Sequence, residues 1–251
     1  QNMKTPVWIV LLLLLTAEVQ AQLRLQQVEL QAAPGALLQN YTDDALVFER
    51  RRNRTTVAGA THFLLQTHWR FAGRWQGGIG LGMRTDRFTM NRVNAVDGLF
   101  AIVLLPFGAR PFADTLPLEQ VKMRNRLLSV PLSFSYDLTA RASAPVHFLV
   151  RAQLIPSFLL SARAGTTLAA GAVLPAGRQA QLQQTYEDAV NSFSLLLAPE
   201  VNMQVRFPRS PLGIQLGLQP LAFDLAQTNS RFLRGQTHLR LSFGLLYTWQ
   251  R

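Results

Sequence analysis

Residues 237–250 read THLRLSFGLLYTWQ, and this stretch decides the fold class. Every second residue from Leu239 to Trp249 is large and apolar, whereas the residues between them are mostly polar or small. Successive side chains of a β-strand point to opposite faces, so this spacing predicts a strand with one apolar face. That face could pack inside a soluble ligand-binding barrel or face lipid around a membrane barrel. Alternation by itself is compatible with both.

The same alternation recurs along the chain and predicts eight strands in one all-β domain. The predicted strands lie near residues 23–33, 62–71, 74–84, 127–138, 146–162, 192–207, 212–223 and 237–250. The links between them alternate in length. The short links are 72–73, 139–145 and 208–211, and the longer ones are 35–58, 89–122, 163–190 and 225–234. Outer-membrane barrels alternate brief periplasmic turns and longer outer loops in this way.

Two local features bear on strand register. Ala72 and Gly73 alone separate the second strand from the third, so we predict a tight hairpin turn at these residues. Four prolines each remove a backbone donor within a predicted strand, and we expect local irregularity at them. They are Pro131, Pro156, Pro199 and Pro220.

Three features favour lipid as the medium around the apolar face. The strands are mostly about ten residues or longer, which suits a tilted crossing of the apolar layer. Lys4 and Lys122 are the only lysines, although a water-exposed surface normally intersperses lysine with acidic residues. Aromatic residues stand near predicted strand ends, as in interfacial girdles. They are Trp69, Phe71, Trp75, Tyr136, Phe207, Tyr247 and Trp249 toward the periplasm, and Phe63 and Phe193 toward the outside. We therefore predict an eight-stranded antiparallel up-and-down transmembrane β-barrel.

The start of the chain indicates export. Lys4 precedes the apolar run VWIVLLLLL, and Val19-Gln20-Ala21 fits the pattern that signal peptidase accepts. We predict a cleaved signal peptide at residues 3–21 and a barrel domain at residues 22–251, in the bacterial outer membrane. The formal net charge is +11. In an exported chain this excess points to phosphate-bearing lipid head groups before nucleic acid, for which no motif is present. The lack of cysteine excludes disulfides, thiolate metal sites and cysteine nucleophiles.

The order of these segments resembles the PorT-like outer-membrane β-barrel family. LLSVPLSFSYDL resembles that family's apolar strand with an internal proline, and HFLVRAQLIPSFLLSARAG resembles its next strand. The segments SFSLLLAPEVNMQVRF, LGIQLGLQPLAF and HLRLSFGLLYTW fall where its last three strands fall. The resemblance covers residues 59–251. It implies an eight-stranded outer-membrane barrel, some of whose relatives act in protein secretion.

With the apolar face toward lipid, the alternate polar positions point into the lumen. The predicted luminal network comprises His68, Arg70, Arg74, Asp137, His147, Arg151, Glu200, Arg206, His238 and Arg240. An unpaired buried charge is unfavourable, so we expect Arg151 or Arg240 to contact Glu200. An eight-stranded interior is just wide enough for side chains to fill, which favours a rigidifying network over a proton or solute path. The three luminal histidines show no metal-ligand spacing, and we predict neither a metal nor a cofactor.

The outer loops carry the remaining candidates. Arginines in and near the first two loops suit phosphate oxygens, so contact with lipopolysaccharide is one reading and a solvated charge run without a partner is the other. They are Arg50, Arg51, Arg52, Arg54, Arg87 and Arg92. The second loop contains GLFAIVLLPFGARPF, which is too apolar for a freely wet segment and could extend the wall, cover the mouth or contact a partner.

Two function classes fit these patterns. We predict a non-enzymatic outer-membrane protein with a structural or interaction role, accessory to protein secretion or envelope assembly. The alternative is an enzyme at the barrel rim that modifies lipid or cleaves peptide. Such an enzyme needs a base and a nucleophile or activated water near the outer loops, and His62 with Asp43 and Asp44 is the candidate set.

Overall fold

A computed structural model of the chain describes residues 24–41, 55–91, 102–107, 110–115, 118–139, 143–168, 177–188, 190, 192–225 and 233–249. The predicted signal peptide at residues 3–21 lies outside them. The strands are β1 (Arg24–Tyr41), β2 (Thr55–Ala72), β3 (Trp75–Asn91), β4 (Ile102–Phe107), β5 (Arg110–Thr115), β6 (Leu118–Ser129), β7 (Leu132–Asp137), β8 (Val146–Leu168), β9 (Phe193–Arg206), β10 (Leu212–Asp224) and β11 (Leu233–Thr248). The helix α2 (Arg178–Asp188) lies between β8 and β9.

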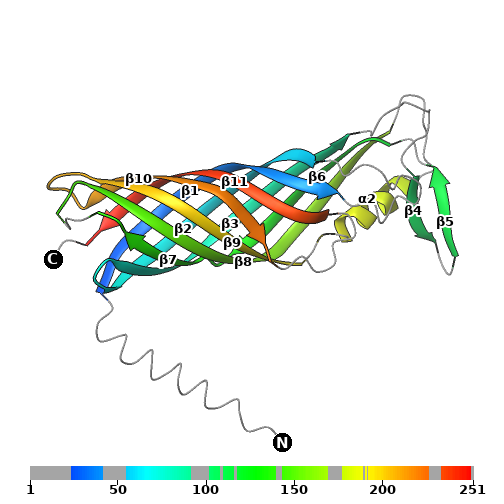
Figure 1. Cartoon of the computed structure of the whole chain (residues 1–251). Coiled ribbons are helices and arrows are strands. Elements are labelled where there is room, and N and C mark those ends of the chain that lie inside the picture. Colours follow the sequence, from blue (N-terminus) through cyan, green and yellow to red (C-terminus); the bar gives the residue numbers. More distant parts are fainter. Residues whose placement is uncertain are drawn as a thin grey trace, which may run out of the picture.

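The strands close into a barrel (Figure 1). Antiparallel pairing runs from β1 through β2, β3, β6 with β7, β8, β9, β10 and β11, and then returns to β1. β6 and β7 occupy one position in the wall, because both pair with β3 on one side and β8 on the other. The wall therefore has eight strand positions. Closure gives every wall strand a partner on both sides, which lipid requires because it offers no hydrogen bonds. The predicted eight-stranded antiparallel up-and-down barrel is confirmed.

The wall is irregular at two places that involve prolines, and the four prolines lie at these places or directly across from them. Val130 and Pro131 separate β6 from β7, and the Val130 N–H donates to the Pro156 carbonyl at 2.9 Å, so the wall stays closed across the break. Pro220 lies where β10 shifts register against both of its neighbours. Pro156 and Pro199 keep their ladder positions in the β8–β9 pairing. On their other sides, Pro156 lies opposite the break between β6 and β7, and Pro199 lies in the β9 segment that faces the shift in β10. A proline lacks only its own N–H, so its effect depends on whether that group would face a partner strand.

The two faces of the wall are polar inside and apolar outside. Leu241 and Leu245 are 53% and 63% exposed, whereas Arg240 and Ser242, on either side of Leu241, are 2% and 3% exposed. Exposed large apolar side chains of this kind recur on the other wall strands. At the end with the short turns, the ring of Trp75 lies 4.7 Å from that of Phe134. A soluble barrel would have the opposite arrangement, so the apolar exterior faces lipid, and barrels of this construction reside in bacterial outer membranes.

The strands extend further than the sequence predicts. β1 continues to Tyr41, β6 begins at Leu118, and β8 reaches Leu168, so the ends of the predicted loops 35–58, 89–122 and 163–190 belong to the wall. Ladder pairing can continue where alternation fades, because backbone hydrogen bonds do not depend on side-chain type. The first hairpin turn is at Gly73–Arg74 rather than 72–73, since Ala72 pairs with Trp75, and Gly73 has a φ of 52° that suits glycine.

The outer loops contain structure that the sequence patterns do not predict. β4 and β5 form a separate two-stranded sheet, so the described residues of the apolar segment, 102–107 and 110–112, do not extend the barrel wall. The helix α2 lies within the predicted loop 163–190. Figure 1 shows α2 and the β4–β5 hairpin beyond one end of the barrel. No helix in the described part of the chain is long and apolar enough to cross a membrane.

Candidate functional site

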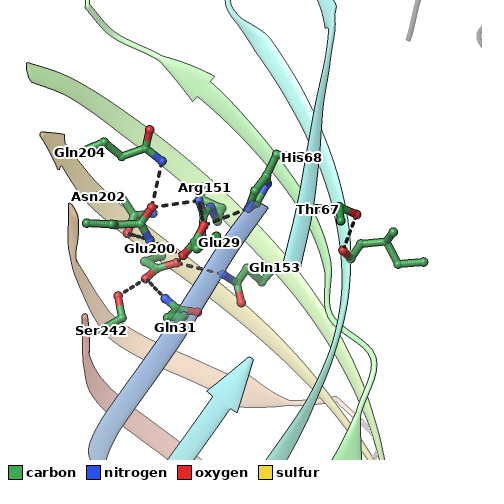
Figure 2. Close-up of polar contacts among 12 residues, drawn as sticks. Glu29, Gln31, Thr67, His68, Arg151, Gln153, Glu200, Asn202, Gln204 and Ser242 are labelled. Carbon is green, nitrogen blue, oxygen red and sulfur yellow. Dashed lines mark hydrogen bonds and ion pairs between the residues drawn. The ribbon is translucent and has the colours of Figure 1, made fainter. Parts of the chain in front are cut away.

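An ion pair crosses the centre of the lumen (Figure 2). Arg151 on β8 donates from Nη2 to Glu29 Oε2 at 2.9 Å and from Nη1 to Glu29 Oε1 at 3.3 Å. β1 and β8 are four positions apart in the ring of eight, so this bidentate ion pair joins opposite sides of the wall. His68 Nε2 lies 2.9 Å from Glu29 Oε2, and Gln215 Nε2 donates to Glu29 Oε1 at 2.6 Å. The carboxylate of Glu29 is therefore fully engaged.

Glu200 on β9 is the second acidic residue of this central cluster. Its Oε1 accepts hydrogen bonds from Ser242 Oγ at 2.6 Å and Gln31 Nε2 at 3.1 Å, and its Oε2 accepts one from Gln153 Nε2 at 2.9 Å. Arg151 Nη1 lies 3.6 Å from Glu200 Oε2. An arginine expected from the sequence thus contacts Glu200. Its shorter contact is with Glu29, which the sequence analysis did not place in the luminal network.

A second cluster lies further along the lumen. Arg84 on β3 donates from Nε to Asp86 Oδ2 at 2.9 Å and from Nη1 to Ser194 Oγ at 3.3 Å. Arg240 Nη1 lies 3.0 Å from His62 Nδ1, which must accept this hydrogen bond because a guanidinium only donates. All four ionisable side chains are buried.

His62 is therefore not a rim residue. The rim-enzyme alternative then lacks the histidine that was its candidate general base. β2 begins at Thr55, so His62 lies well inside the wall, and its ladder partner is Arg84. It is 1% exposed and faces the lumen. Asp43 and Asp44 lie outside the described residues. The position of His62 was misjudged because the second strand begins earlier than its alternation indicates.

The remaining predicted luminal residues other than His238 lie nearer the short turns. His147 Nδ1 is 2.8 Å from Asp137 Oδ2, and Asp137 Oδ1 also accepts from the Thr139 N–H at 2.9 Å. Arg70 and Arg206 are half-buried. Arg74 is exposed, which corrects its assignment to the lumen, because it belongs to the turn and not to β3. The backbone of His238 lies in β11, but its side chain is not among those described.

Two groups of charged residues escaped the sequence analysis. Arg84 and Asp86 have the i, i+2 spacing that puts both side chains on one face of a strand. The pair could have been predicted by extending the polar alternation of the third strand two residues beyond Arg84. Lys122, Arg124 and Arg126 have the same phase as the apolar Leu128, so they lie on the outer face of β6. They were missed because residues 89–122 were assigned to a loop and the predicted strand began only at residue 127.

The arrangement excludes some chemistry within the described residues and provides a rigid core. In that part of the chain, no group of three or more histidine, cysteine or acidic side chains could hold a metal ion. The buried charges there are the arginines Arg84, Arg151 and Arg240 and the carboxylates Glu29, Asp86, Asp137 and Glu200. The two signs nearly balance, with histidines and two half-buried arginines in addition. Such compensation allows many charges to be buried together.

Comparisons with known proteins assign this chain to no family. Neither a family model nor a curated protein matches the sequence, so the resemblance to the PorT-like family stays a prediction. Similar solved structures include Neisserial surface protein A, with 11% identity and a TM-score of 0.39 over 88% of this chain and 97% of that chain. Another is Ail of Yersinia pestis in complex with the heparin analogue sucrose octasulfate, with 11% identity and a TM-score of 0.31 over 90% of this chain and all of that chain. A third is the translocator domain of the autotransporter NalP from Neisseria meningitidis, with 9% identity and a TM-score of 0.30 over 97% and 95% of the two chains. At these values the likenesses carry no argument about function.

Proposed function

We propose that this chain is a non-enzymatic outer-membrane barrel with an interaction role, accessory to protein secretion or envelope assembly. The observation that carries the proposal is the bond between Arg151 and Glu29 across the lumen. Together with Glu200 and their amide partners, these side chains occupy the centre of an interior that is just wide enough for side chains. A lumen closed in this way leaves the surface elements as the parts that can act.

Structure beyond the wall supports a protein partner. The helix α2 and the β4–β5 hairpin lie past one end of the barrel, and α2 contacts β8 through a bond from the Ala164 N–H to Glu187 Oε1 at 2.8 Å. β9 begins opposite Phe158, so this bond occupies part of a β8 edge that β9 leaves uncovered. The strand motifs that resemble the PorT-like family support a role in secretion. The lumen-facing position of His62 opposes the rim-enzyme alternative.

Cross-linking in intact cells tests this proposal. A photoreactive amino acid at the exposed Gln184 of α2, and another at Val103 of β4, should give a defined protein adduct that can be purified and identified. The matched control is the same amino acid at the exposed Arg209, in the turn between β9 and β10 at the opposite end of the barrel. Adducts that are identical at all three positions, or absent from both outer positions, would contradict the proposal.

A further inference from the structure

Five basic side chains gather on the outer face of the barrel wall. Arg87 belongs to β3, Lys122, Arg124 and Arg126 belong to β6, and Arg163 belongs to β8. All five are exposed, and the three strands are neighbours in the wall. We refer to these five residues as the basic patch. It combines three strand segments that are far apart in sequence, and its residues lie outside the luminal network.

The ladder places the patch just beyond the lipid-facing apolar surface. Met83, Leu128 and Phe158 pair across the same three strands and form an apolar row on the outer face. Four residues further along β3 and β6, away from the short turns, Arg87 pairs with Arg124; on β8 the corresponding step is five residues, because the ladder of β6 and β8 shifts within it. This distance is about 13 Å along the strand, or about 10 Å along the barrel axis at the usual strand tilt. Lipid head groups lie immediately outside the hydrocarbon layer, within reach of arginine side chains.

Like charges face one another directly within the patch. Arg124 pairs with Arg87 on one side and with Arg163 on the other, so three guanidinium groups share one ladder row. Directly opposed like charges destabilise a sheet. The neighbouring guanidinium groups of Arg126 and Arg87, and more weakly that of Arg163, lower the pKa of Arg124. Among the described residues no ion pair involves a member of this row; Asp86, next to Arg87 in sequence, faces the lumen and pairs with Arg84.

Hydroxyl groups accompany the cations. Arg126 lies one same-face step nearer the apolar row than Arg124, and its ladder partners are Thr85 and Ser161. Guanidinium forks and hydroxyl donors are the groups that bind phosphate oxygens. An anion on this row would turn the repulsion among the arginines into attraction to a shared partner.

We propose that the basic patch is a binding site for the phosphate groups of an outer-leaflet glycolipid, lipopolysaccharide. The apolar row beneath the patch would contact the acyl chains of the same molecule, so one amphiphile satisfies both surfaces. This continuity favours a membrane lipid over a free anion. The inference goes beyond the proposed protein-partner role and does not rest on it. Arg87 was named from the sequence for such contact, whereas Arg50, Arg51, Arg52, Arg54 and Arg92 lie outside the described residues.

The test compares two variants of the full chain that each lose two positive charges. Arg87→Gln/Arg124→Gln removes half of the patch's guanidinium groups, whereas Arg74→Gln/Arg209→Gln alters exposed turns at the other end of the barrel. Binding of fluorescent lipopolysaccharide to each protein in a phosphate-free non-ionic detergent gives the affinity. We expect about tenfold weaker binding for the patch variant, as the loss of one charged hydrogen bond implies, and a change below about twofold for the control.

A second readout separates binding from a purely structural role. In lipid-free detergent the patch variant should unfold at a higher temperature than the wild type, because repulsion is removed. With lipopolysaccharide present the order should reverse. A variant that unfolds earlier in both conditions would overturn the proposal.

Two further probes identify the source of the phosphate. Dephosphorylated lipopolysaccharide should bind the wild type about as weakly as intact lipopolysaccharide binds the patch variant. Inorganic phosphate at the same phosphate concentration should not reproduce the thermal shift. Equal binding of the dephosphorylated lipid, or an equal shift with inorganic phosphate, would overturn the assignment of the site to a phosphorylated lipid.

Discussion

Replacing Arg151 with methionine tests whether the central cluster holds the barrel together. The substitution keeps a long side chain but removes the cation that contacts two buried carboxylates, Glu29 at 2.9 Å and Glu200 at 3.6 Å. Breaking a buried ion pair from one side typically destabilises a protein by about 3–5 kcal/mol. Both carboxylates keep neutral hydrogen-bond donors, so we expect the free energy of unfolding to fall by about 3 kcal/mol, the lower end of this range. Urea unfolding of the barrel in lipid vesicles measures this free energy.

The double variant Arg151→Met/Glu29→Gln makes the measurement specific. It removes both charges of the shorter pair, so it should be less destabilised than Arg151→Met alone. A double-mutant cycle of the two substitutions should give a coupling energy of at least about 1 kcal/mol between Arg151 and Glu29. Arg74→Met, in the exposed turn, is the matched control and should change stability by less than about 0.5 kcal/mol. A loss below about 1 kcal/mol for Arg151→Met, or no coupling with Glu29, would refute the reasoning.

Three other predictions concern packing, orientation and the closed lumen. A side chain at Gly217 would overlap Ser242 and the Glu200 carboxylate, so Gly217→Val should destabilise the barrel by about 1–3 kcal/mol, whereas Gly77→Ala, on the outer face, should be nearly neutral in the same unfolding assay. Leu241→Arg puts a charge into lipid and should lower the free energy of unfolding by about 2–4 kcal/mol. Leu212→Arg, near a periplasmic turn, should lower it by about 1 kcal/mol or less. Equal losses for the two variants would show that the apolar face does not meet a bilayer. The wild-type barrel in a planar lipid bilayer should show no stepwise ion conductance, and regular open-channel steps would contradict a lumen closed by side chains.

Much of the fold could be predicted because its main signal is local. Period-two alternation depends only on the geometry of one strand, so Leu241 and Arg240 can be assigned to opposite faces without knowledge of any neighbour. The number of strand positions and the short turns follow from the same pattern. The assignment of the apolar face to lipid needed additional signals, namely strand length, scarce lysine and terminal aromatic residues.

Strand ends and loop structure were harder to predict. β6 extends back to Leu118 because β3 supplies backbone partners as far as Gln120 and β8 supplies them as far as Leu118, and no side-chain pattern is needed for that pairing. The hairpin β4–β5 and the helix α2 occur in segments that alternation assigned only to loops. The turn at Gly73–Arg74 differs by one residue from the prediction because the ladder, rather than the apolar phase, determines where pairing stops.

The sequence by itself determined which side chains of a strand face inward, because that property repeats every two residues. Only the tertiary structure decided which inward side chains meet. Arg151 reaches Glu29 from the opposite side of the wall, His62 meets Arg240 inside the lumen, and Arg87, Arg124 and Arg163 share one row outside. The height of each residue along the barrel depends on the register of every strand pair around the closed ring, and a change of two residues in one register would preserve the faces while exchanging the partners.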